Sequence, residues 1–557
     1  MKRPVIVLAL LSILALLTSN SALASGPPPT RVSNGDPFAT CLGGGNSNPR
    51  TMNYQSAEVE PWIASNPTNP NNLIGTWQQD RWSDGGAKGQ VASWTFDGGQ
   101  TWGQTPQPFT TCAQPFYKTR VLRYERTSDP WVSIGPDGTA YAVSLPFDGD
   151  FIRNGLGAAV SVDGGKTWIR QKDIDPLVAR ADTLDPSDDK QSVTADPLHP
   201  GWAYAVWEHF VDVFVCPAGP SRAAVRSGHG GVHPNTRAAT SSATPCGFSA
   251  PTYLSRTTNF GRTWSKPKLI VPTGVFEQTL DNQILVNHQT GTLYDFYNYI
   301  NAAGENNIEM VFSTDRGATW SPRQPVERLA TNEETNLQCR CGVTYPGDES
   351  KPLRTGDTVP SFAIDPNTGQ LYVVWQDGRA NPVAGAKNDM LFASTSTRGG
   401  LPGTWSDPVR VNPGNDRAAF TAAINVNSSG QVGIAYYDLT PPLTSPDVLL
   451  TDTWFATTDG PGLAFGPRRL IGGPYNMLAA PFALGFFVGD YIGLAVAAGD
   501  QQGGETVQNA GHGDEGGFTP LFVMTNCRDT SCRAVGTPDG TPAGPDSTDA
   551  FTRAPSG

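Results

Sequence analysis

Acidic residues recur at one position of a repeated strand pattern, near the start of the first strand of successive units. Carboxylates gathered in this way can transfer protons, act as nucleophiles or bind a cation, and glycoside hydrolysis usually needs two of them. Equivalent positions of a repeat lie on one face of the assembled ring, so we expect these side chains to converge. They are Glu60, Asp129, Asp281 and Asp490, with the pair Asp189-Lys190 shifted slightly in the third unit.

A second acidic set follows the second strand of these units and falls on the same expected mouth of the ring. It comprises Asp80, Asp148, Glu208, Asp377 and Asp438. One reading is a carboxylate-lined pocket for a sugar, for a divalent cation such as calcium, or for both. The other is that these acids only bind turn amides or pair with Lys190, Arg81 and Arg379. The sequence indicates no other cofactor.

The elements that would position these acids are marked by a repeated turn, in which Ser or Thr, Asp, Gly, Thr and Trp follow in fixed order. Full copies are Ser161–Trp168 and Ser313–Trp320, and close variants end at Trp102 and Trp264. Asp accepts hydrogen bonds from turn amides and Gly adopts positive φ, so the Asp of each turn is expected to be structural. Recurrence of one unit along the chain predicts an array of similar β-units.

Each unit contains short strands in the same order, which predicts an all-β propeller of four-stranded blades. Six units end in a recognisable turn, and a seventh begins at Gly489 and resumes at Pro520 without one. We therefore expect seven blades, or alternatively six, with the last closed by a strand around residues 37–41. The expected organisation is a signal peptide over 1–24, an N-terminal segment over 25–57, the propeller over 58–532 and a disordered tail over 533–557.

The start of the chain predicts export. Lys2 and Arg3 precede an apolar run from Val5 to Leu17, and Ala22-Leu-Ala24 forms a small-residue cleavage pattern. No later segment approaches the roughly 20 apolar residues of a transmembrane helix. The formal charge of -12 argues against nucleic acid, whose phosphates require basic surface. We expect a secreted monomer without a transmembrane segment.

The eight cysteines of an exported chain are expected to form disulfides. A zinc site would need four ligands with suitable spacing, and the cysteines do not offer one. Cys339-Arg-Cys341 is too closely spaced for an easy mutual bridge. The candidate pairs are Cys41 with Cys112, Cys216 with Cys246, and Cys527 with Cys532.

The turns and the strand order resemble the sialidase superfamily, whose β-propellers carry Asp-box (BNR) repeats, over residues 58–525. The resemblance implies a carbohydrate-active protein. Family sialidases use a Tyr nucleophile assisted by Glu, an Asp acid/base, and three Arg residues that bind the substrate carboxylate. On this chain the resemblance implies catalytic roles for Asp80, Tyr491 and Glu208, and substrate-binding roles for Arg81, Arg153 and Arg379. The pocket acids Glu60, Asp129, Asp281, Asp377 and Asp490 would also bind the substrate.

The chain departs from the family at the Phe-Arg-Ile-Pro motif of true sialidases, where it reads Glu58-Val-Glu60-Pro-Trp62. An acid in place of the first Arg would repel an anionic sugar, so a neutral or cation-bridged glycan is favoured. We expect a secreted glycoside hydrolase that acts on an unidentified glycan. The alternatives are a non-catalytic propeller that binds a glycan or a protein, and a polysaccharide lyase or metal site using histidines. The histidines in question are His209, His229, His233 and His288.

Overall fold

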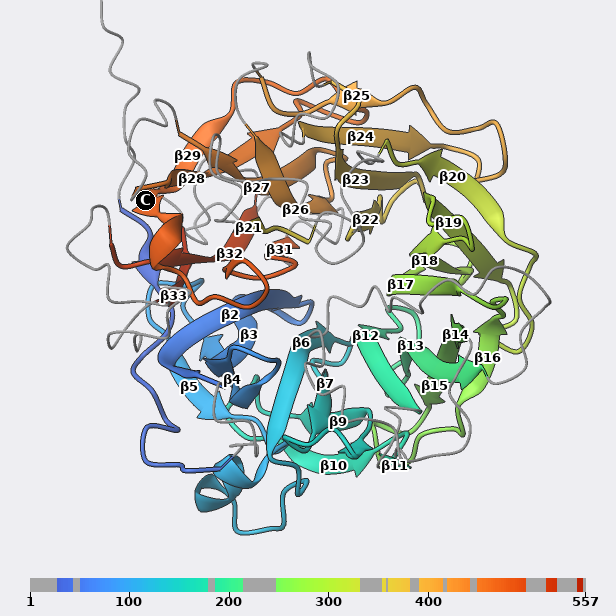
Figure 1. Cartoon of the computed structure of the whole chain (residues 1–557). Helices are drawn as coiled ribbons and strands as arrows, with labels where there is room; N and C mark the ends of the chain where they lie inside the picture. The colour runs from blue at the N-terminus through green and yellow to red at the C-terminus, as the bar shows by residue number, and fades with distance from the viewer. Residues whose placement is uncertain are drawn as a thin grey trace, which may run out of the picture.

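The computed structural model shows that this chain folds mainly into antiparallel strands arranged around a common centre (Figure 1). The structure describes residues 28–43, 51–178, 186–213, 247–330, 353–356, 359–380, 390–413, 418–440, 448–496, 517–527 and 548–553. Within these ranges the helices are short 3-10 turns, η1 (Thr111–Phe116) and η2 (Met477–Ala479). Neither is long or apolar enough to cross a membrane. The fold is therefore an all-β propeller.

Consecutive strands form the blades, and each blade is named after its innermost strand. The β2 blade contains β2 (Asn53–Asn66), β3 (Asn69–Trp82), β4 (Ala87–Thr95) and β5 (Gly103–Pro106). The β6 blade contains β6 (Arg126–Ile134), β7 (Ala140–Phe147), β9 (Gly157–Ser161) and β10 (Ile169–Asp173), with the short strands β8 (Arg153–Asn154) and β11 (Leu177–Val178) beside them. The β12 blade contains β12 (Ser187–Ala195), β13 (Ala203–Val213), β15 (Thr252–Thr257) and β16 (Lys268–Val271).

The next blades follow the same order. The β17 blade contains β17 (Glu277–Val286), β18 (Leu293–Ile300), β19 (Asn306–Ser313) and β20 (Gln324–Arg328), and β14 (Gly247–Ala250) joins it to β13. The β22 blade contains β22 (Ser361–Ile364), β23 (Leu371–Asp377), β24 (Met390–Ser396) and β25 (Val409–Arg410). The β26 blade contains β26 (Ala419–Val426), β27 (Val432–Leu439), β28 (Leu450–Thr457) and β29 (Arg469–Asn476). Outside the blades, β21 (Leu353–Arg354) pairs in parallel with β30 (Phe486–Phe487).

The last blade is assembled from both ends of the chain. Its inner strands are β31 (Gly493–Val496) and β32 (Phe518–Thr525), followed by β33 (Thr548–Thr552) from the C-terminal region and β1 (Thr30–Arg31) from the N-terminal region. The backbone N–H of Ala550 donates to Glu58 Oε2 at 2.6 Å, which fastens β33 to the β2 blade. The sequence had predicted disorder over 533–557 and closure by residues 37–41. Thr548–Thr552 instead form a strand, so the expectation of disorder is wrong for these residues, while 533–547 lie outside the described residues. Thr30–Arg31, and not residues 37–41, pair with that strand.

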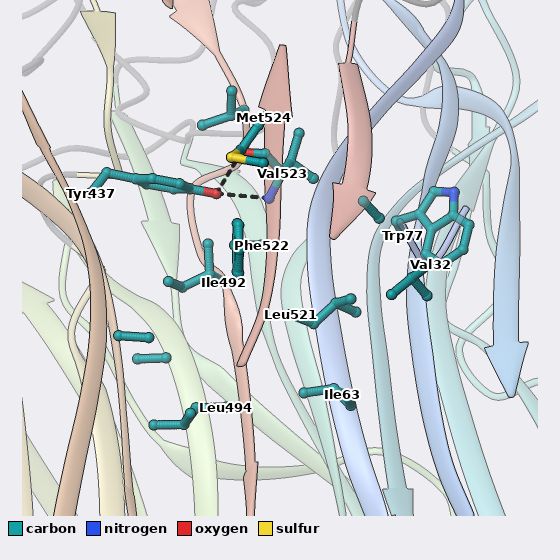
Figure 2. Close-up of a cluster of buried hydrophobic side chains, with 14 of the residues drawn as sticks. Val32, Ile63, Trp77, Tyr437, Ile492, Leu494, Leu521, Phe522, Val523 and Met524 are labelled. Carbon is teal, nitrogen blue, oxygen red and sulfur yellow. Dashed lines mark hydrogen bonds between the residues drawn. The ribbon is translucent and has the colours of Figure 1, made fainter. Parts of the chain in front are cut away.

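The closing blade packs through apolar side chains on both of its faces (Figure 2). Leu521 and Ile63 belong to one buried cluster with Trp77 of the β2 blade. On the other side, the Tyr437 hydroxyl accepts from the Val523 N–H at 2.9 Å and donates to the Val523 carbonyl at 3.0 Å. This hydroxyl therefore satisfies a backbone donor and acceptor of β32 and holds the β31 blade against the β26 blade.

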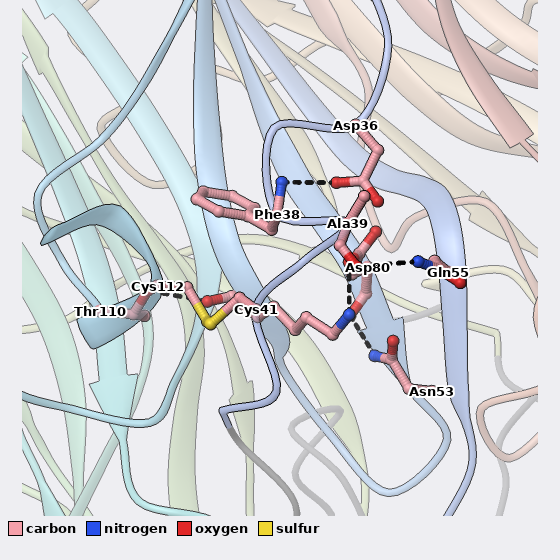
Figure 3. Close-up of a disulfide and its surroundings, with 10 residues drawn as sticks. Asp36, Phe38, Ala39, Cys41, Asn53, Gln55, Asp80, Thr110 and Cys112 are labelled. Atoms are coloured by element: carbon pink, nitrogen blue, oxygen red, sulfur yellow. Dashed lines mark hydrogen bonds and ion pairs between the residues drawn. A yellow bond between two sulfur atoms is a disulfide. The ribbon is translucent and has the colours of Figure 1, made fainter. Parts of the chain in front are cut away.

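A disulfide fixes the N-terminal segment to η1, which follows the β2 blade (Figure 3). Cys41 pairs with Cys112 across 71 residues, as predicted. Closing a loop of that length stabilises a fold by about 4 kcal/mol, mainly by restricting the unfolded chain. Cys527 is also disulfide-bonded. The remaining cysteines, Cys216, Cys246, Cys339, Cys341 and Cys532, lie outside the described residues.

The closing role of β33 predicts a sharp difference between two truncations. Deleting residues 548–557 removes buried strand residues and the partner of β1, so we expect the melting temperature to fall by roughly 10 °C or more. Deleting only 554–557 keeps β33 and should change it little. Calorimetry of both proteins measures the effect. Equal melting temperatures for the two truncations would contradict a closing role for β33.

Candidate functional site

The innermost strands share one irregularity that directs side chains toward the ring centre. β2, β6, β12, β17 and β26 each carry a bulge, where an extra residue shifts the register against the second strand. A bulge re-aims a side chain and, with positive φ on a residue other than Gly, costs of order 1 kcal/mol or more. The positive-φ bulge residues are Glu60, Asp129, Lys190, Asp281 and Thr421.

Lys190 lies among carboxylates from three other blades. Its Nζ is 2.8 Å from Asp490 Oδ2, 3.5 Å from Glu60 Oε1 and 3.7 Å from Asp129 Oδ1, and its side chain is 1% exposed. Burial lowers the pKa of Lys190, but the surrounding acids outweigh burial and raise it well above its usual value. Arg354 of β21 completes the cluster, with Nε 2.9 Å from Asp490 Oδ1 and a second nitrogen 2.5 Å from Oδ2. Five segments distant in sequence therefore meet in one ion network.

The acids around this network have pKa values that differ in direction. Burial would raise the pKa of Asp129, but Lys190 and hydrogen bonds from Glu60 and Ser128 lower it overall. Burial raises the pKa of Glu60 well above its usual value despite Lys190. Burial also raises the pKa of Asp281 to about 7, although the positive charge of Lys190 acts to lower it. One carboxylate is thus held ionised beside groups that bind protons near neutral pH.

Glu208 is the least satisfied acid of the cluster. It is 0% exposed, and neither carboxylate oxygen has a hydrogen-bond partner among the described residues. Burial raises its pKa well above the usual value, and the nearby Asp189 adds to this effect. Burial, followed by Asp129, also raises the pKa of Asp189 to about 7. Glu208 is therefore a buried carboxyl whose surroundings favour its protonated form.

Two other residues singled out from the sequence join the cluster. Arg81 donates to Gln78 Oε1 at 2.7 Å, and Gln78 donates in turn to Glu60. The Tyr491 hydroxyl donates to the Pro130 carbonyl at 3.1 Å, and burial raises its pKa well above the usual value. A nucleophilic Tyr would need the opposite shift. The predicted residues that the structure brings together are Glu60, Arg81, Asp129, Glu208, Asp281, Asp490 and Tyr491.

Asp80 lies apart from this cluster. Side chains alternate along a strand, so Asp80 points away from its neighbour Arg81 and toward the N-terminal segment (Figure 3). Its Oδ1 accepts from the Ser56 N–H at 2.8 Å, and its Oδ2 is 2.9 Å from Lys88 Nζ. These contacts hold the carboxylate that the sequence assigned as acid/base beside Ser56 and Lys88, away from the cluster.

The other predicted arginines also lie elsewhere. Arg153 pairs with Asp148 at 2.6 Å, and its side chain is 48% exposed. Arg379 is 3.4 Å from Glu327 and stacks over Trp375. The side chain of Asp377 lies outside the described residues, as do His229 and His233.

The Asp residues of the repeated turns bind within their own turns, as expected. Asp163 accepts from the Thr167 N–H at 2.9 Å and from the Thr167 hydroxyl at 2.6 Å. In the equivalent turn, hydrogen bonds from the Thr319 side chain, the Thr319 N–H and Ser313 lower the pKa of Asp315 to about 2. These turns follow the third strands, at the end of each blade opposite the start of the first strand. They shape the fold and lie away from the ion network.

No protein-family model and no curated protein matches this chain. Among solved structures it is similar to an α-L-arabinanase from Penicillium chrysogenum in complex with arabinobiose, at 14% identity and a TM-score of 0.41, over 69% of this chain and 92% of that one. It is also similar to a Hadza microbial sialidase, at 14% identity and a TM-score of 0.38, over 81% and 74% of the two chains. A polysaccharide lyase acting on ulvan shares 11% identity and a TM-score of 0.38, over 74% and 79%. These likenesses are too distant to assign an activity, so the function must be argued from the site.

A separate buried acid, Asp295 of β18, has no compensating group. It is 0% exposed, neither oxygen has a partner among the described residues, and burial raises its pKa well above the usual value. Its cross-strand neighbours are Ile284 and Val311. At pH values between its unfolded and folded pKa, Asp295 therefore takes up a proton on folding.

Replacing Lys190 with Met should destabilise the fold by about 3–5 kcal/mol at pH 7, because it leaves buried carboxylates without their cation. The pKa of Lys190 is raised, so its contribution is fully present at pH 7. In the variant the folded pKa of Asp129 rises, so the deficit should shrink as the pH falls toward 4. Denaturant unfolding at several pH values measures this. Arg328→Met removes an exposed ion pair and should cost less than about 1 kcal/mol; a similar loss in both variants would contradict the role of Lys190.

Asp295→Asn should stabilise the protein in a pH-dependent way. The raised pKa of the wild-type carboxyl makes folding less favourable as the pH rises above about 4, by up to about 1.4 kcal/mol per pH unit until the folded pKa is reached. The neutral amide of Asn removes this dependence of the unfolding free energy on pH. The unfolding free energies of the two proteins should therefore be similar near pH 4 and diverge toward pH 7. Parallel curves across that range would show that Asp295 is ionised in the folded protein.

Proposed function

We propose that the protein is a secreted, carbohydrate-active hydrolase with a sialidase-like propeller of seven blades, and that it cleaves a glycosidic bond near the ring centre. The observation that supports this most directly is the opposed titration of two neighbouring acids. Burial raises the pKa of Glu208 well above its usual value, whereas the pKa of Asp129 is lowered overall. Glycoside hydrolysis needs one protonated and one ionised carboxyl group flanking the bond, and such pairs identify acid and base.

In this proposal Glu208 donates a proton to the leaving oxygen. It suits this role because burial favours its protonated form and because its oxygens have no hydrogen-bond partner among the described residues. Asp129 acts as nucleophile or base, held ionised by Lys190. The proposal assigns the acid role to Glu208 and not to Asp80, which contacts Lys88 and Ser56. Tyr491 lines the site and has no catalytic role in it.

The charges of the cluster favour a neutral glycan. Glu60 and Asp281 add acidic groups, while the ammonium of Lys190 and the guanidinium of Arg354 already bind carboxylates of the protein. A substrate carboxylate would have to compete with Asp490 for both cations. Hydroxyl groups of a neutral sugar can instead donate to the carboxylates.

The second candidate is a non-catalytic glycan-binding propeller, and the depth of the cluster favours it. Glu208 is 0% exposed and Asp129 is 3% exposed, so substrate can reach them only if side chains near the ring centre move apart. In that case the network holds the blades together and a glycan binds above it. A lyase would draw on His209, whose ring contacts Tyr253 at 5.1 Å between centroids.

A screen of neutral and acidic polysaccharides decides between these functions. Released reducing ends support the hydrolase, binding without turnover supports the second candidate, and unsaturated products that absorb ultraviolet light support a lyase. Once a substrate is found, Glu208→Gln and Asp129→Asn should each lower kcat by roughly 100-fold or more. The rate should fall at high pH as Glu208 loses its proton and at low pH as Asp129 gains one.

Asp315→Asn is the matched control for the charge change, because Asp315 lies in a turn away from the ion network. It should retain the wild-type rate, and circular dichroism should confirm that all variants fold. Hydrolysis that persists at full rate in folded Glu208→Gln would rule out the proposed acid.

A further inference from the structure

A separate group of potential metal ligands lies where the β6 blade meets the β12 blade. Asp175 follows β10, Asp188 belongs to β12 and His209 belongs to β13. One ligand atom from each lies within 4.8 Å of the others. His209 Nδ1 is 2.7 Å from Asp188 Oδ1 and 3.8 Å from Asp175 Oδ2. The two blades thus present an imidazole and two carboxylates to one point.

This group is distinct from the ion network, although the two share a pair of strands. Asp188 is paired with His209 across β12 and β13, whereas Asp189 is paired with Glu208. Successive side chains on a strand point to opposite faces, so Asp188 and His209 share the face opposite to Asp189 and Glu208. Asp189 and Glu208 interact with Lys190, while Asp188 and His209 interact with Asp175.

An unsatisfied atom in this group indicates a missing ligand. Asp188 Oδ2 is buried and has no hydrogen-bond partner among the described residues, although Oδ1 contacts His209. The indole of Trp207, on the same face, interacts with both Asp188 and Asp175 and favours their ionised forms. The side chains of His209 and Asp175 are 15% and 17% exposed, so one side of the group is open to solvent. Asp188 is therefore the buried side of the group, and His209 and Asp175 form the side that solvent can reach.

We propose that Asp175, Asp188 and His209 bind a divalent transition-metal cation, with Zn²⁺ as its representative, between the β6 and β12 blades. Ligand atoms around Zn²⁺ bond at about 2.0–2.2 Å, and three protein ligands commonly leave a fourth position for water. The imidazole favours Zn²⁺ over Ca²⁺, which prefers oxygen ligands alone. The cation would replace the hydrogen bond between His209 and Asp188 and would bind the unsatisfied Asp188 oxygen.

The same chain offers a control for a simple His–Asp pair. His199 Nδ1 is 3.1 Å from Asp196 Oδ2 on the β12 blade, but no third His, Cys, Asp or Glu of the described residues lies close enough to complete a metal site with this pair. If His209 and Asp188 only form an ion pair, the two sites should respond alike to Zn²⁺. If His209 and Asp188 bind a cation, replacing His209 should weaken Zn²⁺ binding and replacing His199 should not.

Isothermal titration of the chelator-treated, full-length protein with Zn²⁺ tests the proposal. Wild type should bind a Zn²⁺ ion that His209→Ala and Asp175→Asn bind more weakly by at least roughly 10-fold. His199→Ala should bind like wild type. Thermal unfolding should rise with Zn²⁺ in wild type and His199→Ala, and much less in the other two. Asp175 is partly exposed, so its replacement keeps the test valid if His209→Ala fails to fold.

Three results would overturn the proposal. One is the absence of Zn²⁺ binding by the wild-type protein. Another is binding that is unchanged in folded His209→Ala and Asp175→Asn, which would place the ion elsewhere. The third is a preference for Ca²⁺ over Zn²⁺ at this site, which would contradict the inferred role of the imidazole.

Discussion

The contact of Lys190 with Asp490, Glu60 and Asp129 is the constraint around which the ring is organised. Taking these charges out of water is costly, and the cost is offset only if all partners are in place at short range. Lys190 belongs to the β12 blade, and its partners lie in the β2 and β6 blades and directly before β31, so the network is satisfied only when the chain ends have closed the ring. A buried network of this kind favours one arrangement of the blades over others that would bury a similar apolar area.

The bulges explain how the β2 and β6 blades can present carboxylates to the Lys190 ammonium of the β12 blade. In a regular strand alternate residues face the neighbouring blades, and none is directed specifically to the ring centre. The extra residue at Glu60, Asp129 and Lys190 breaks this alternation and turns one side chain inward at the same level of each blade. The backbone strain of positive φ is thus compensated by the network that these residues form.

The repeated units of the sequence made part of this structure predictable, whereas features that do not repeat could not be predicted. Equivalent positions of the units were visible in the sequence, so the convergence of Glu60, Asp129, Asp281 and Asp490 could be anticipated. The bulge could not, and it is the reason that Lys190, not Asp189, occupies the equivalent position in the β12 blade. Arg354 was missed because β21 lies outside the repeating units and reaches Asp490 through a contact 136 residues away in sequence.

The ends of the chain were harder to predict for a related reason. Residues 548–552 follow a segment rich in Gly and Pro, whose composition is typical of disorder, and a strand of five residues carries too little pattern to stand out against it. Its burial depends on β1, more than 500 residues earlier in the chain, where Thr30 pairs with Thr552. Local sequence cannot report a pairing of that kind.

The strands β12 and β13 connect the two candidate sites. Their paired residues alternate in direction, with Asp189 and Glu208 toward the ion network and Asp188 and His209 toward the β6 blade. A cation bound by Asp188 and His209 would fix the start of β12, the segment that carries Lys190 two residues later. Metal binding would then restrict the position of the ammonium that keeps Asp129 ionised. The two sites would then be coupled through one strand pair, without any need for a longer path through the protein.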